Sequence, residues 1–85
     1  MKLEIVSSDA HNIYQVAWLE LNTPVGNFII QQGHAPMILS LSPNRPITFR
    51  LKTGKQQTIN ANTGMAKITR ESTILIIDTH HDMPL

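Results

Sequence analysis

The 85-residue chain contains no cysteine, which excludes disulfide bridges and thiolate metal ligands. Its net charge is only +1, so it lacks the basic excess typical of nucleic-acid-binding proteins. No apolar run is long enough to span a membrane, and the alternating residues Met1–Ile5 do not form a signal peptide. We therefore expect one soluble, cytosolic domain that reaches a membrane only as a peripheral part of a complex.

Motifs for catalysis are equally scarce. No Gly-x-Ser-x-Gly elbow accompanies His34, and the chain has no glycine-rich phosphate loop and no closely spaced acidic pair. We interpret His34 as a residue whose ring and neighbouring backbone hydrogen-bond each other and fix a loop; a hydrolase that uses His34 is the minor alternative. We predict a protein that is not an enzyme and has no cofactor and no small-molecule substrate.

The four histidines, His11, His34, His80 and His81, do not have the spacing of a zinc site. Adjacent side chains such as those of His80 and His81 point apart in an extended strand. We predict no metal site.

Short alternating or apolar segments bounded by turn residues dominate the rest of the chain and predict β-strands. The expected strands are 2–6, 13–21, 28–30, 37–41, 47–51, 56–61, 65–68 and 73–77. The sequence thus predicts an all-β fold, a small sandwich or flattened barrel of about 8–10 short strands. A β-bulge near Ala17 or Trp18 would turn Val16, Leu19 and Leu21 all toward the core and leave Trp18 outside.

Two rigid connections flank the 28–30 strand. Thr23–Asn27 is a tight turn, in which Gly26 can adopt a positive φ. Gly33–Pro36 forms a second loop, because Pro36 restricts the residue before it. Such dense backbone constraint favours loops that hold their shape for contact with a partner.

Several large apolar side chains occupy strand positions that alternate with the core-facing ones and so point away from the predicted core. Trp18, Ile29, Ile74 and Ile76 either pack between two sheets or form a partner-facing surface, and the pattern leaves both open. Basic residues gather around one hairpin, and we interpret them as a solvated sheet face rather than a phosphate site; they are Arg45, Arg50, Lys52 and Lys55.

The turn, strand and loop together carry a resemblance to a known family. Gly26, Phe28, Ile30 and the run Gly33–Pro36 resemble the Gly-His-Ala-Pro-Leu region of the amino-terminal β-sandwich domain of the ATP synthase epsilon subunit (delta in mitochondria), with Met37 in place of leucine. The similarity extends from Leu3 to about Asp78. It implies a non-catalytic central-stalk (rotor) subunit of a proton- or sodium-translocating rotary ATP synthase, at the cytoplasmic face of the cell membrane.

The resemblance also implies which residues meet the gamma subunit and the c-ring. The c-ring side would be the turn Thr23, Pro24, Val25, Gly26 and Asn27. The loop toward gamma and the ring would be Gln31, Gln32, Gly33, His34, Ala35 and Pro36. Trp18 and Ile29 are a possible gamma-facing surface.

Two of the chain's departures from the family pattern bear directly on function. Asn27 stands where the family often has an acid, so an ionic contact to a basic ring loop would be lost. The family's two-helix hairpin after Ile77–Thr79 is missing, so we expect no nucleotide binding and no latch-type inhibition. We divide the chain into an epsilon-like domain, 1–79, and a flexible tail, 80–85. A free-standing β-sandwich adaptor or ligand-binding module is the alternative function.

Overall fold

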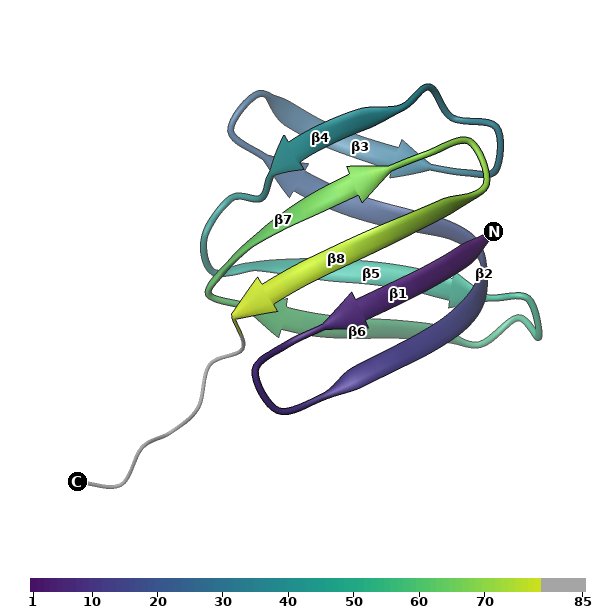
Figure 1. Cartoon of the computed structure of the whole chain (residues 1–85), viewed down its shortest axis with the longest axis horizontal. Helices are drawn as coiled ribbons and strands as arrows, with labels where there is room; N and C mark the ends of the chain where they lie inside the picture. The colour runs from purple at the N-terminus through teal and green to yellow at the C-terminus, as the bar shows by residue number, and fades with distance from the viewer. Residues whose placement is uncertain (79–85) are drawn as a thin grey trace.

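A computed structural model describes residues 1–78 of the chain (Figure 1). These residues form eight strands and no helix, which confirms the predicted all-β fold. The strands are β1 (Lys2–Val6), β2 (His11–Thr23), β3 (Gly26–Ile30), β4 (Met37–Ser40), β5 (Arg45–Leu51), β6 (Gln56–Ala61), β7 (Thr63–Ile68) and β8 (Ser72–Asp78). Over this part of the chain there is accordingly no apolar helix of membrane-spanning length. The predicted boundary at Thr79 and the predicted tail lie outside the described residues.

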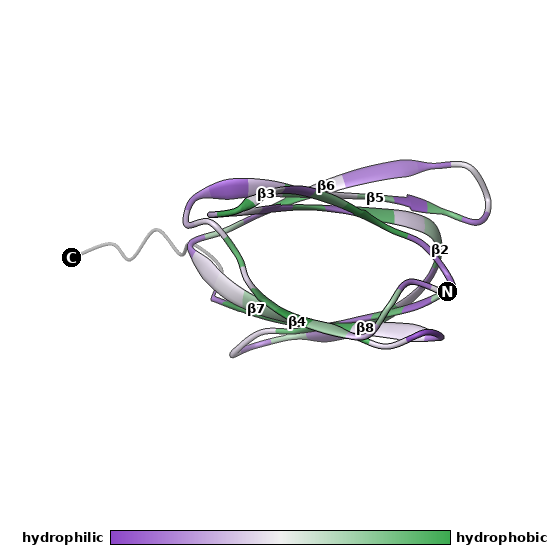
Figure 2. Ribbon diagram, turned by 90° about the horizontal axis from the view of Figure 1, so that it is seen from above, coloured by the Kyte–Doolittle hydropathy of each residue, from purple (hydrophilic) through white to green (hydrophobic). Residues whose placement is uncertain are grey.

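The strands pack as two layers that share one long strand (Figure 2). One layer has the order β4-β7-β8-β1-β2, and β3, β2, β5 and β6 form the other. The first part of β2, His11–Gln15, pairs with β1. Its second part, from Val16 onward, pairs with β5 and β3. All pairs are antiparallel except β1 with β8.

A register shift lies in β2 where it passes from one layer to the other, between Val16 and Trp18. A bulge adds one residue to one strand and so reverses the parity of the side chains beyond it. As a result Val16, Leu19 and Leu21 are all fully buried, although their spacing is irregular. This confirms the predicted bulge.

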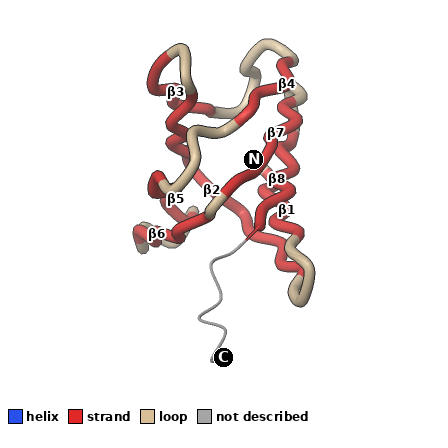
Figure 3. The backbone as a smooth tube through the Cα atoms, turned by 90° about the vertical axis from the view of Figure 1, so that its left-hand side faces the viewer, coloured by secondary structure: helices blue, strands red, loops and turns tan. Residues whose placement is uncertain are grey.

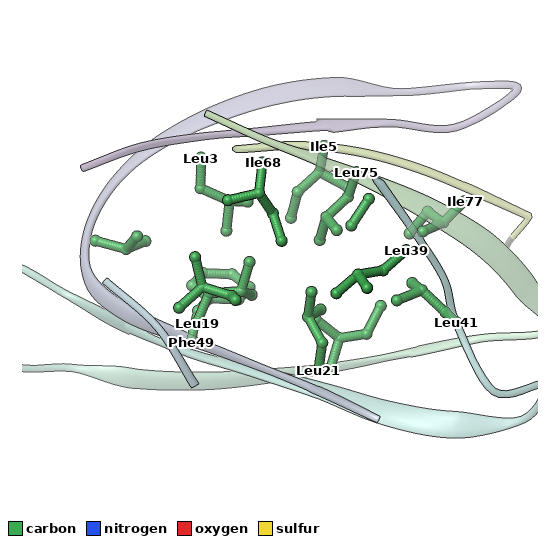
Figure 4. Close-up of a cluster of buried hydrophobic side chains, with 14 of the residues drawn as sticks. Leu3, Ile5, Leu19, Leu21, Leu39, Leu41, Phe49, Ile68, Leu75 and Ile77 are labelled. Atoms are coloured by element: carbon green, nitrogen blue, oxygen red, sulfur yellow. The ribbon is translucent and has the colours of Figure 1, made fainter. Parts of the chain in front are cut away.

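The core fills the space between the layers (Figure 4). Leu3, Leu75 and Ile68 project from one layer toward Leu19 and Phe49 of the other, and all five are essentially inaccessible to solvent. Tyr14 packs its ring against Phe49, with 5.0 Å between centroids and 44° between planes. Since Tyr14 lies in the first part of β2, this contact joins the two layers close to the bulge.

Most strands differ from the expected ranges by one or two residues at an end. β2 begins at His11 and not at Ile13, and β7 begins at Thr63 and not at Met65, so Gly64 is a strand residue. A Cβ on Gly64 would lie 2.9 Å from Ile77 Cγ2 and 3.0 Å from the Ile76 carbonyl oxygen. Glycine is needed there because the neighbouring strand approaches too closely for a side chain.

The first residue extends the sheet. The Met1 amino group donates a hydrogen bond to the Val16 carbonyl oxygen (3.0 Å), and the Val16 N–H donates to the Met1 carbonyl oxygen (2.9 Å). The pKa of this amino group lies below its ordinary value of 8.0, first because burial removes water from the charged form and second because Lys52 is close.

The lowered pKa predicts a rise in stability with pH. In the range between the folded-state pKa and the ordinary value, the unfolded chain binds more protons at this group than the folded chain does. We therefore expect the free energy of unfolding to increase as the pH rises through that interval, with the full gain reached above about pH 9. Urea unfolding across this range measures it, and a chain acetylated at Met1 is the control. An equal increase in the acetylated chain would assign the effect to other groups.

Candidate functional site

The β2–β3 turn is fixed by side-chain hydrogen bonds. Thr23 is buried, with 8% of its surface exposed. Its hydroxyl donates to the Gly26 carbonyl oxygen at 2.9 Å and accepts from the Val25 N–H at 3.3 Å. Gly26 has φ 137°, which confirms the predicted positive value. The turn therefore presents Val25, 82% exposed, at the tip of a rigid scaffold.

The β3–β4 loop is fixed by its backbone and by His34. The Gly33 N–H donates to the Arg70 carbonyl oxygen (2.7 Å), which ties the loop to the β7–β8 turn. The His34 Nδ1–H donates to the Ala35 carbonyl oxygen at 2.8 Å. The predicted role of His34 as a loop-fixing residue is thus confirmed.

Replacing Gly33 by alanine tests this loop. Gly33 has φ 88°, and nothing lies within 4 Å of the position a Cβ would take, so the cost comes from the backbone alone. We expect the free energy of unfolding to fall by about 1–2 kcal/mol in Gly33→Ala. Chemical denaturation measures it, with Gln32→Ala as an exposed control that should change stability by less than about 0.5 kcal/mol. Equal losses of stability in the two variants would contradict the expected backbone strain at position 33.

The turn and the loop lie at opposite ends of β3, along one edge of the sandwich (Figure 1). A strand of this length separates them by roughly 17 Å. The structure thus places Thr23–Asn27 and Gln31–Pro36 on the same edge but does not bring them together into one cluster.

A surface rich in apolar side chains covers the outside of the layer that contains β1 and β8. We call it the apolar face; it consists of Val6, Ile13, Ile38, Met65, Ile74 and Ile76. Strand register makes these side chains neighbours: Met65 pairs with Ile76, and Ile76 pairs with Val6. The next row of cross-strand neighbours includes two charged residues. Lys67 lies between Ile38 and Ile74, and Glu4 lies between Ile74 and Ile13.

The apolar face is open to solvent. Ile38 is 69% exposed, Ile76 60%, Ile13 56% and Met65 51%. These are four of the six large hydrophobic residues that are exposed in the described chain. Exposed apolar groups gathered on one sheet face, here interleaved with Lys67 and Glu4, are typical of interaction surfaces. Ile76 therefore does not pack between the two sheets, and its role in a partner-facing surface stays a prediction.

A hollow of about 430 Å³ joins the apolar face to the β3–β4 loop. Ile38 and Lys67 line it from the sheet, and Pro36 lines it from the loop. The loop that the resemblance assigned to a partner contact therefore borders the apolar face.

Trp18 and Ile29 lie on the outside of the other layer. Ile29 is 47% exposed beside Glu20, and Trp18 is half-buried with Arg50 as its cross-strand neighbour. Polar residues surround them, including Thr48 and Asn27. This second surface is smaller and more polar than the apolar face, and it points the opposite way.

Titratable side chains form little that could support chemistry. Among residues 1–78 no three or more His, Asp or Glu side chains are grouped as metal ligands. His11 pairs instead with Glu4, which also contacts Lys2 at 3.9 Å. His80 and His81 lie outside the described residues.

The basic residues around β5 do not form one patch. Arg45 is the first residue of the strand, whereas Arg50, Lys52 and Lys55 lie at its other end, around the β5–β6 turn. The predicted loose cluster is therefore divided, and Arg45 belongs to a different end of the sandwich.

The two packed layers, the fixed turns and the exposed apolar face define this protein as a small β-sandwich domain. Its sequence matches the family "ATP synthase, Delta/Epsilon chain, beta-sandwich domain" over residues 1–81, and the chain belongs to that family. This confirms the resemblance found in the turn, strand and loop.

Solved structures agree on the fold. A chain from the Euglena gracilis mitochondrial ATP synthase (OSCP/F1/c-ring, rotational state 1) superposes with a TM-score of 0.79 at 19% identity, over 88% of this chain and 48% of that one. A chain from the Tetrahymena thermophila mitochondrial ATP synthase (central stalk/c-ring) gives 0.78 at 12% identity, over 92% of this chain and 63% of that one. The present chain thus spans about half to three fifths of the length of these two. No curated protein matches it by sequence.

Proposed function

We propose that the chain is a non-catalytic central-stalk (rotor) subunit of a proton- or sodium-translocating rotary ATP synthase, where it couples the gamma subunit to the c-ring. Family membership supports this proposal, and the apolar face is the observation that carries it. A chain of this size that leaves four large hydrophobic side chains exposed on one sheet face needs a partner to cover them. As part of that complex it is peripheral to the membrane, at the cytoplasmic face of the cell membrane.

The surfaces divide between two partners. We assign gamma to the apolar face, because exposed apolar side chains with a few charged residues among them suit a lasting protein interface. The loop Gln31–Pro36 borders that face and lies toward gamma and the ring. The turn Thr23–Asn27, whose exposed tip is Val25, faces the c-ring. Trp18 and Ile29 are the competing gamma-facing surface, and the variants described in the Discussion separate the two.

Co-purification from native membranes tests the proposal. The ATP synthase is extracted in mild detergent from cells that produce the chain, and the complex is captured through another subunit. We expect the chain to be recovered with gamma and the c-ring. A chain that stays free while gamma is present in excess would overturn the proposal and favour a free-standing adaptor or ligand-binding module of the same fold.

A further inference from the structure

The end of the sandwich near the β2–β3 turn carries a polar hollow of about 500 Å³. It lies between the β2–β3 turn and the β4–β5 connection, which crosses from one layer to the other (Figure 3). The Ser42 N–H donates to the Asn22 carbonyl oxygen at 2.8 Å and so holds the two connections together. The residues that line the hollow include Asn22, Pro24, Asn27, Ser42, Pro43 and Arg45.

Among residues 1–78, Arg45 is the only charged residue that lines this hollow. It shares the strand parity of Ile47 and Phe49, which are buried, so its side chain is directed to the opening between the layers and not to the outer sheet face. Within residues 1–78 its guanidinium has no ion pair and no hydrogen bond. Glu20 and Asp78, which lie near the ends of β2 and β8, do not line the hollow. An unpaired arginine is thus aimed into a concave surface that lacks acidic side chains.

Amide groups beside Arg45 add oriented donors. Asn27 Nδ2 donates to Asn22 Oδ1 at 3.1 Å, and Asn22 Nδ2 donates to the Pro46 carbonyl oxygen at 3.2 Å. Each amide nitrogen carries two hydrogens, so each keeps one for another acceptor. A guanidinium with neighbouring amide N–H groups matches the planar, doubly accepting carboxylate.

We propose that this hollow binds an aspartate or glutamate carboxylate of the stalk or ring subunit seated against the β2–β3 turn, with Arg45 as the specificity-determining residue. This inference rests on the proposed function. It adds the chemistry of the contact: this end of the domain accepts an acidic side chain of its partner.

A zero-length cross-link tests the contact directly. Arg45→Lys keeps the positive charge and introduces an amine, and a carbodiimide joins an amine to a carboxylate only when the two are in contact. The amide bond forms between that amine and the carboxyl carbon, and one carboxyl oxygen leaves with the carbodiimide as its urea. The reaction is run on the complex extracted from membranes, and mass spectrometry identifies the joined peptides. Arg50→Lys, at the opposite end of the same strand, is the matched control.

We expect Arg45→Lys to give a peptide joined to an Asp or Glu of the stalk or ring, which is absent from Arg50→Lys. In parallel, Arg45→Gln should weaken retention of the chain in the complex about three- to tenfold, and Arg50→Gln should change it less than about twofold. An intact complex with no such cross-link and unchanged retention would overturn the inference while leaving the proposed function in place. A product joined to a lipid headgroup would also overturn it. Failure of the natural chain to co-purify would instead remove the proposed function, and the inference with it.

Discussion

Ile76→Lys is expected to weaken binding to the gamma subunit by about 2–4 kcal/mol, which is roughly 30- to 1,000-fold in the dissociation constant. Ile76 occupies the middle of the apolar face, between Met65 and Val6. A lysine there would be buried by the partner without a counter-charge. Since Ile76 is 60% exposed in the free domain, we expect the free energy of unfolding to change by no more than about 1 kcal/mol. Titration of purified gamma into the chain measures the affinity.

Ile29→Lys is the matched control for that variant. Ile29 is an exposed strand isoleucine too, at 47%, but it lies on the outside of the other layer. We expect gamma binding to change by less than about threefold in Ile29→Lys, since an exposed substitution outside an interface costs little. The reverse result, in which Ile29→Lys loses binding and Ile76→Lys keeps it, would move gamma to the surface of Trp18 and Ile29.

Phe49→Ala should cause the largest loss of stability, about 3–5 kcal/mol in the free energy of unfolding. Phe49 is fully buried, pairs with Leu19 across β2 and β5, and contacts the Tyr14 ring. The total free energy of unfolding of an 85-residue domain is about 4–13 kcal/mol, so the variant would lose a large part of its stability. Urea unfolding followed by Tyr14 and Trp18 fluorescence measures the change.

Phe28→Ala provides the comparison for Phe49→Ala. Phe28 lies on the edge strand β3 and is only partly buried against the core. We expect the free energy of unfolding of Phe28→Ala to fall by about 1–2 kcal/mol, because less buried apolar surface is removed and the edge strand can relax around the substitution. Equal losses in the two variants would mean that the core is not centred on Phe49.

Features that depend on residues close together in the chain could be predicted from the sequence. The bulge in β2 followed from the irregular spacing of Val16, Leu19 and Leu21, which only an extra residue reconciles with one buried face. The positive φ of Gly26 followed from local turn chemistry. The family followed from a motif that occupies fifteen consecutive positions.

Features that depend on strand register could not be predicted. The parallel pairing of β1 with β8 joins residues about 70 positions apart, and no local pattern specifies it. Ile76 was recognised as an outward residue, but its neighbours Met65 and Val6 on the apolar face were not, because cross-strand neighbours are unknown until the sheet order is known. The polar hollow was missed for the same reason, since Asn22 and Arg45 lie on separate strands.

The passage of β2 through both layers has a mechanical consequence. Where two sheets are joined only by loops, side-chain packing between them is the main resistance to sliding. Here a single covalent backbone continues from the β1 side into the β3–β5 side, with the Tyr14–Phe49 contact beside the crossing. In the proposed rotor role, a torque delivered at the β2–β3 turn is carried to the opposite layer through peptide bonds, so little rotation is lost to shear inside the domain.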